Sequence, residues 1–289
     1  MCVFFHHATN AIVTPSPGKR PDKHIDFNSS RGNPSLIMAR ITDIYRFPVK
    51  GLSAERLEQA DLEAGKALAN DRRFALALGS ASVSSATIDW MAKNNFLMLL
   101  KNERLAQLEA IFDDTTDTLS ILRGGRQVAR GKLTEGIGRT MIEEFFGAFM
   151  GSEARGRIKV VAASENQTLA DRPKPALSII NLASLRDIER VLGQKLNPLR
   201  LRGNICFESD TPWEEHDWIG RDISIGGARL HVSERIGRCG ATNVNPETAE
   251  RDINLLKVLQ MGFSHTDCGI LAGIESSAQI TIGDEIKVL

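Results

Sequence analysis

Residues 222–246, DISIGGARLHVSERIGRCGATNVNP, combine the pattern that indicates the fold with the residues that suggest the chemistry. Two short apolar runs, residues 222–225 and 228–232, flank a Gly-Gly pair. This arrangement predicts a β-hairpin, because glycine supplies the positive φ that a two-residue hairpin turn needs. The strand pattern then gives way to a loop that contains Cys239. We therefore expect a sheet in which a cysteine follows directly after a strand.

Short segments with strand composition recur along the rest of the chain, whereas segments with helical spacing are few. The expected strands outside this hairpin are residues 41–45, 57–62, 73–78, 119–122, 126–129, 158–161, 178–180 and 203–208, with a last hairpin of residues 278–282 and 285–289. The expected helices are residues 87–94, 133–150, 184–192 and 254–261, with Thr87 and Ser184 as N-caps. The apolar face of the second helix should consist of Ile137, Met141, Ile142, Phe145, Phe146 and Phe149. The pattern predicts a mainly β chain of the α+β class, built from β-barrels or sandwiches.

A length of 289 residues suggests about two domains. Residues 1–37 are rich in proline and polar residues and show no strand or helix period, so we expect a disordered tail there. The helical pattern that ends at residue 150 closes the first domain. The expected domains are therefore residues 38–150 and 151–289.

Charge and cysteine spacing exclude several classes of protein. The basic and acidic residues number 36 each, so no bulk charge favours nucleic acid or an acidic membrane. No apolar run approaches the ~20 residues that span a bilayer, and the first residues lack a signal-peptide pattern. The four cysteines are far apart, which argues against a CxxC zinc site or a disulfide framework. A cytoplasmic protein fits these observations best, and any anion site must be built locally.

Cys239 lies between Arg238 and Gly240 in the loop after the hairpin. A neighbouring arginine favours the thiolate, which is the form that binds metals and acts as a nucleophile. The glycine lets a bulky partner approach the backbone, and Thr242 adds a hydrogen-bonding group. The alternative is a buried packing cysteine, which is the commoner role of a lone thiol.

Two further groups of basic residues suggest an anion site. Arg200, Arg202 and Asn204 alternate with apolar residues on an expected strand and would share one face. Lys50 lies in a Pro/Gly turn and Arg72 at a strand start, so both could reach the same anion. In each case the alternative is a solvated, charged surface.

These groups, in this order, resemble the MOSC domain proteins, in which an N-terminal β-barrel domain precedes the MOSC-type β-barrel domain. The family is named after the C-terminal region of molybdenum cofactor sulfurase and includes the mitochondrial amidoxime-reducing component. The matching motifs are Phe47-Pro48-Val49-Lys50, Asp71-Arg72 with Phe74, Arg202-Gly203-Asn204, Trp218-Ile219-Gly220 after an acidic run, the loop from Arg238-Cys239 to Pro246-Glu247-Thr248, and Gly283-Asp284. The resemblance therefore covers almost the whole chain after the expected tail.

The resemblance implies a molybdenum–pterin cofactor of the molybdopterin type, with Cys239 as the metal ligand. It implies that the other cofactor-binding residues surround the pterin and its phosphate: Lys50, Arg72, Arg202, Asn204, Arg238 and Thr242. Asp171 is nearest to a family aspartate close to the metal, although its spacing differs. The chain departs from the family pattern at Ile236, where a second cysteine is common, at Asn243 and Asn245, which replace Thr and Asp, and near Cys268, which either lies by the site or packs.

The same resemblance implies a molybdenum-dependent oxidoreductase that reduces N-hydroxylated small molecules. An external donor protein would supply the electrons, because the sequence has no flavin, haem or iron–sulfur motif. Two alternatives stay open. A sulfur carrier would bear a persulfide on Cys239, and a non-catalytic β-barrel binding module would have lost the cofactor.

Overall fold

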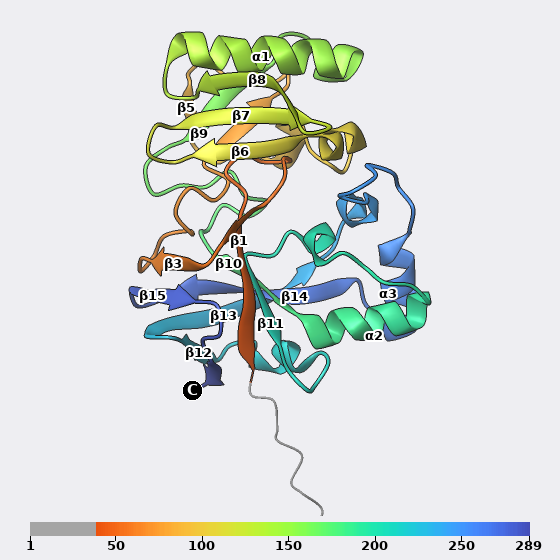
Figure 1. Ribbon diagram of the computed structural model, residues 1–289. Helices are drawn as coiled ribbons and strands as arrows, with labels where there is room; N and C mark the ends of the chain where they lie inside the picture. Colours follow the sequence, from red (N-terminus) through yellow and green to blue (C-terminus); the bar gives the residue numbers. More distant parts are fainter. Residues whose placement is uncertain (1–38) are drawn as a thin grey trace, which may run out of the picture. The chain divides into compact units, whose positions relative to one another are not determined.

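Half of the described strands form one eight-stranded sheet, in the order β16-β12-β13-β14-β10-β11-β1-β2 (Figure 1). In that order they are Ile286–Val288, Asp222–Ile225, Ala228–Gly237, Asp267–Ile274, Leu177–Asn181, Ile205–Glu208, Arg40–Arg46 and Glu55–Leu57. All neighbours run antiparallel except β10 and β11. The computed structural model describes residues 39–289, and the tail predicted for residues 1–37 lies outside them.

Three smaller sheets and three α-helices complete the regular structure of residues 39–289. The sheets are β15 (Ala278–Thr281) with β3 (Gln59–Leu62), β4 (Phe74–Ala77) with β9 (Lys159–Ala163) and β5 (Thr87–Ile88), and β6 (Glu109–Asp113) with β7 (Thr118–Arg123) and β8 (Arg126–Lys132). The helices are α1 (Gly136–Met150), α2 (Leu182–Leu192) and α3 (Leu255–Phe263). The prediction of a mainly β chain with few helices is confirmed.

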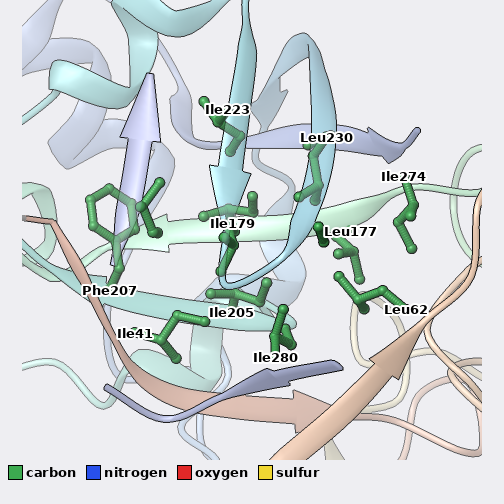
Figure 2. Packing of buried hydrophobic residues seen from close by; sticks show 14 of the residues in the cluster. Ile41, Leu62, Leu177, Ile179, Ile205, Phe207, Ile223, Leu230, Ile274 and Ile280 are labelled. Atoms are coloured by element: carbon green, nitrogen blue, oxygen red, sulfur yellow. The ribbon is translucent and has the colours of Figure 1, made fainter. Parts of the chain in front are cut away.

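The eight-stranded sheet and the β3–β15 pair share one hydrophobic core (Figure 2). Ile41, Phe207 and Ile223 come from the large sheet, and Leu62 and Ile280 come from β3 and β15. None of these five side chains is more than 2% exposed. Burial of each contributes on the order of 2 kcal/mol, so this core holds the two sheets together.

Strand pairing joins parts of the chain that are far apart in sequence. β1 pairs with β11, with Ile44 opposite Ile205. β9 pairs with β4, with Val160 opposite Leu76. The large sheet therefore uses a strand from the start of the chain, and the sheet of β4 uses a strand that follows α1. The domain boundary at residue 150 stays a prediction.

The two hairpins predicted at Gly-Gly pairs are confirmed, because β12 pairs with β13 and β7 pairs with β8. The first glycine of each pair, Gly226 and Gly124, has positive φ. The last hairpin is wrong, since β15 pairs with β3 and β16 pairs with β12. Ile280 and Ile286 both enter the core from these positions, so burial decides the pairing.

Two local predictions near the start of the chain are also wrong. Residues 87–94 do not form a helix: β5 pairs in parallel with β9, and only Lys93–Asn95 forms a 3₁₀ helix. Sheet pairing here overrides a weak local preference. The strand expected at residues 57–62 is interrupted at Glu58, so that β2 and β3 belong to different sheets.

Helix α2 is confirmed, but its predicted N-cap is not. The helix begins at Leu182, and the side chain of Asn181 caps it by accepting from the Ala183 N–H at 2.9 Å. Ser184 is instead buried inside the helix. Its hydroxyl donates to the Glu215 carboxylate at 2.9 Å and accepts from the Trp213 N–H at 2.7 Å.

Helix α1 packs on β8 with almost no space between the two backbones (Figure 1). A Cβ atom at Gly138 would lie 2.2 Å from the Lys132 carbonyl oxygen. This contact fixes which side of the helix faces the sheet, and the predicted apolar face is therefore too broad. Ile142 is buried, whereas Ile137 and Met141 are 81% and 52% exposed.

We expect Gly138→Ala to lower the free energy of unfolding by about 3 kcal/mol, because the β8 backbone must move to admit a methyl group. Gly147→Ala on the same helix is the matched control, since nothing lies within 4 Å of its Cβ position. Gly147→Ala should raise the free energy of unfolding by as much as about 1 kcal/mol, because alanine favours the helix more than glycine does. Urea unfolding measures both values, and equal effects would contradict the close packing.

A half-buried aromatic cluster contains a buried histidine that its surroundings keep neutral. His216 is 6% exposed, and its ring lies 5.5 Å from the ring of Trp213 and 5.5 Å from that of His265. Burial, assisted by the charges of Arg235 and His265, lowers the pKa of His216 to about 4. The folded-state pKa is thus below the ordinary value of 6.5. The contribution of neutral His216 to the free energy of unfolding is therefore fully present above pH 6.5 and is lost as the pH drops toward 4.

We expect His216→Phe to reduce this acid sensitivity. Phenylalanine keeps an aromatic ring in the cluster and cannot take up a proton. Melting temperatures of wild type and variant, compared from about pH 7 to pH 4, should diverge in favour of the variant as the pH falls. Parallel curves would show that His216 does not titrate on unfolding.

Candidate functional site

A cavity of about 410 Å³ collects basic side chains from distant parts of the sequence. It is named the cationic cavity, because eight lining residues are lysine or arginine and only two are aspartate. The basic residues are Lys50, Arg72, Lys93, Arg172, Lys174, Arg200, Arg202 and Arg238. The seven predicted site residues all line it: Cys239, Lys50, Arg72, Arg202, Asn204, Arg238 and Thr242. The structure brings these residues together, and their roles in binding stay predictions.

Cys239 lies where β13 ends and the 3₁₀ helix Gly240–Asn243 begins, as the sequence predicted. Its carbonyl oxygen accepts from the Thr242 N–H at 3.1 Å and from the Thr242 hydroxyl at 2.9 Å. These bonds hold the backbone of the loop in place. The thiol is partly exposed on the cavity wall, so it is accessible to a ligand in the cavity.

Asp171 bridges two lysines beside this thiol. Its carboxylate contacts Lys50 Nζ at 2.6 Å and Lys93 Nζ at 3.1 Å. Burial opposes ionisation of Asp171, but the two ammonium groups outweigh it and lower the pKa to about 2. Partial burial opposes the charge of Lys93, but Asp171 and the neighbouring Cys239 sulfur outweigh it and raise the pKa. Asp171 is therefore an anion, held between two cations, on the cavity wall.

Lys50 is buried at the base of this arrangement. Besides Asp171, its ammonium group donates to the Leu169 carbonyl at 2.8 Å. Burial lowers the pKa of Lys50, the charges of Arg72 and Arg202 lower it further, and Asp171 only partly opposes this. A second anion in the cavity would favour the charged form of the lysine.

Arg202 is a cation of the cavity that lacks an ion-pair partner among residues 39–289. Its Nη1 donates to the Leu52 carbonyl at 2.8 Å, and no carboxylate within residues 39–289 forms an ion pair with it. Burial, followed by the charge of Arg72, lowers the pKa of Arg202 to about 9. Cations held away from water normally have an anionic partner. The protein alone does not supply one, so Arg202 indicates where an anionic ligand would bind.

The local structure of Arg202 differs from the prediction. Pro198–Leu201 is a 3₁₀ helix and Arg202 has positive φ, so Arg200 and Arg202 do not alternate on a strand. The signal was present in the sequence: the Asn197 side chain caps the Leu199 N–H, and Pro198 occupies the first helical position. β11 starts only at Ile205.

Arg72 and Arg202 are held on the same aromatic ring. Their guanidinium carbons lie 4.3 Å and 4.2 Å from the centroid of Phe47. Arg72 also pairs with Asp71 and donates to the Arg202 carbonyl at 2.9 Å. Asp71 in turn accepts from the Phe47 N–H at 2.8 Å. The turn that contains Phe47 is thus the support on which the two cations lie.

Asn204 and Arg238 bind mostly to the protein itself. Asn204 accepts from the Ser178 hydroxyl at 2.8 Å and donates to the Tyr45 carbonyl at 3.1 Å. The guanidinium of Arg238 donates to the Leu201 carbonyl at 2.7 Å and to the carbonyl of Cys268. Both side chains therefore fasten strands and loops around the cavity.

The residues at which the Cys239 loop departs from the family pattern make structural contacts within the chain. Asn243 accepts from the Leu255 N–H at 3.0 Å, at the start of α3. Asn245 donates to Asp252 at 2.8 Å. Ile236 packs against a hydrophobic cluster that contains Cys268, which is fully buried and does not line the cavity. Burial raises the pKa of Cys268 to about 12, as expected of a packing thiol.

Sequence reasoning did not single out Lys93, Arg172 or Lys174. Lys93 lies outside every motif, in a segment wrongly expected to be helical. Arg172 and Lys174 follow Asp171 in a proline-containing loop, and only their closeness to Asp171 could have drawn attention to them.

Two features are absent from residues 39–289. No group of three or more His, Cys, Asp or Glu side chains is placed to hold a metal ion. No helix in this part of the chain has the length and apolar character to cross a membrane.

Comparison with protein families gives two matches. The model of the MOSC N-terminal beta barrel domain matches residues 38–135, and that of the MOSC domain matches residues 166–287. No curated protein is significantly similar in sequence. Among solved structures, the YUAD protein from Bacillus subtilis has 12% identity and a TM-score of 0.42, over 88% of this chain and 97% of that chain. YiiM from Geobacillus stearothermophilus has 16% identity and a TM-score of 0.30, over 39% of this chain and 53% of that chain.

Proposed function

The chain belongs to the MOSC domain proteins, and we propose that it binds a molybdenum–pterin cofactor in the cationic cavity and reduces N-hydroxylated small molecules. The observation that carries the proposal is the presence in one cavity of an accessible thiol, Cys239, and a poorly compensated cation, Arg202. The thiol suits a soft metal and the cation suits a phosphate.

The residues of the cavity fit such a cofactor in size and in charge. Its volume of about 410 Å³ lies within the range of ~300–1,000 Å³ that is usual for ligand pockets. Cys239 would supply the protein's sulfur donor to the metal. Lys50, Arg72 and Arg202 would bind the phosphate. Only two of these three cations are paired with an aspartate, Lys50 with Asp171 and Arg72 with Asp71. The bound cofactor would supply the redox chemistry, as cofactors generally do.

The residues of the chain would then position the reactants. Thr242 fixes the loop that carries Cys239, and Asp171 holds Lys93 beside the thiol. Reduction of an N-hydroxyl group takes two electrons and two protons and gives an N–H bond and water. The electrons would come from an external donor protein, since none of the binding residues is itself redox-active in this reaction. Such a protein would act on small molecules in a reducing compartment.

The test is a reduction assay with cofactor-loaded protein, an artificial reductant and a panel of N-hydroxylated bases and amidoximes. We expect turnover by the wild type and at least about a hundredfold less by Cys239→Ala, because the metal loses its protein ligand. Equal rates for both proteins would reject the reductase proposal. Absence of turnover by either, with a persulfide detectable on Cys239, would favour a sulfur carrier instead.

A further inference from the structure

A second cavity of about 400 Å³ lies against the cationic cavity and differs from it in chemistry. It is named the apolar cavity, because fifteen of its twenty lining residues are apolar or glycine. Five residues line both cavities: Gly51, Leu99, Arg200, Arg202 and Ala241. Neither Cys239 nor Lys50 lines the apolar cavity, so the proposed cofactor site does not include most of it.

The apolar walls come from several parts of the chain. Phe47 and Leu52 belong to the turn after β1, Leu105 and Ala106 to the 3₁₀ helix Glu103–Gln107, and Val244 to the loop after Cys239. A mostly apolar lining with a few polar groups is the usual composition of a small-molecule site. The walls therefore suit a compact apolar body such as an aromatic ring system.

The polar groups at the shared wall are the two arginines. Arg200 is buried and pairs with Asp252 at 2.7 Å, and its Nε has no hydrogen-bond partner. Arg202 carries a charge that no carboxylate of residues 39–289 balances through an ion pair. Glu109, the acidic residue of the lining, is exposed. The wall shared with the cationic cavity thus presents one positive charge, that of Arg202, without an ion-pair partner among residues 39–289.

We propose that the apolar cavity is a second binding site, which takes a small monoanion with an apolar body, of the aromatic carboxylate class. The ring system fills the space between Leu52, Leu105 and Ala106. The carboxylate accepts hydrogen bonds from Arg202 and balances its charge. A mostly apolar cavity with a cation that lacks an ion pair on one wall selects both parts of such a ligand.

The binding test uses the purified full-length chain without cofactor and 2-naphthoate as the probe, followed by isothermal titration calorimetry. We expect saturable binding, at least about tenfold tighter than that of naphthalene-2-methanol, which has the same ring system without the charge. Ala106→Phe and Ala54→Phe each narrow the apolar cavity without touching the lining of the cationic cavity. Each should weaken binding by about tenfold or more.

Ala148→Phe is the matched control, because Ala148 is an exposed residue of α1 that lines neither cavity. It should bind the probe as the wild type does. The two narrowing variants lie on separate segments, so either one decides the matter if the other fails to fold. Absence of wild-type binding, undiminished binding by a folded narrowing variant, or equal binding of the uncharged probe would each overturn the proposal. The result does not depend on metal or activity, so it stands apart from the test of the cofactor.

Discussion

Cys239→Ala protein, made in a host that synthesises the cofactor, is expected to purify folded but with at least about tenfold less molybdenum than the wild type. The side chain is partly exposed, and the loop is held by backbone bonds to Thr242 that alanine retains. The apo-protein melting temperature should therefore change by no more than about 2 °C, as for a surface substitution. Metal analysis and thermal unfolding of the same samples measure both effects.

Cys268→Ala provides the matched control because it removes a thiol with the opposite surroundings. Cys268 is fully buried and lies outside both cavities. This variant should lose about 1–2 kcal/mol of stability through the small void and keep its molybdenum. If Cys239→Ala keeps a full complement of metal, the ligand assignment is wrong.

The second large effect is expected for Arg202→Met. In the absence of an anion, Arg202 is held close to Arg72 on the Phe47 ring, and both burial and that charge disfavour its charged form. Methionine removes the repulsion and keeps much of the apolar contact, at the loss of one hydrogen bond to Leu52. The apo-protein should thus melt at the same temperature as the wild type or higher.

Cofactor content should fall by at least about tenfold, because the phosphate loses a cation that has no ion-pair partner among residues 39–289. Arg130→Met is the control: Arg130 is exposed on β8 and lines neither cavity. It should leave both quantities unchanged. A variant at Arg202 that binds the cofactor as the wild type does would show that this side chain has a structural role alone.

Local sequence signals were sufficient to predict two hairpin turns and the position of the Cys239 thiol. The Gly-Gly pairs predicted two hairpins, because few other residue pairs readily adopt the positive φ of a two-residue turn. The end of the strand pattern before Cys239 placed the thiol at the end of β13. The meeting of Lys50, Arg72 and Arg202 followed from the order of motifs in the resemblance, since nothing in their local sequence connects them.

Long-range pairing was beyond local signals. Residues 87–94 were expected to be helical because the partner strand of β5 gives no local signal. This partner, β9, lies about 75 positions further along the chain. The two arms of the last expected hairpin pair instead with β3 and β12, which are far from them in the sequence. Lys93 could not be found for the same reason. It contacts both Asp171 and Cys239, and no pattern in the sequence relates these three positions.

The most direct test of the central claim is the molybdenum and pterin content of the wild-type protein made in a cofactor-synthesising host. We expect about one molybdenum and one pterin per chain, which is the number that one Cys239 thiol in one cationic cavity can hold. Metal analysis gives the first number, and fluorescence of the oxidised pterin gives the second. Protein that purifies folded from such a host with neither component would show that the cationic cavity does not bind the cofactor.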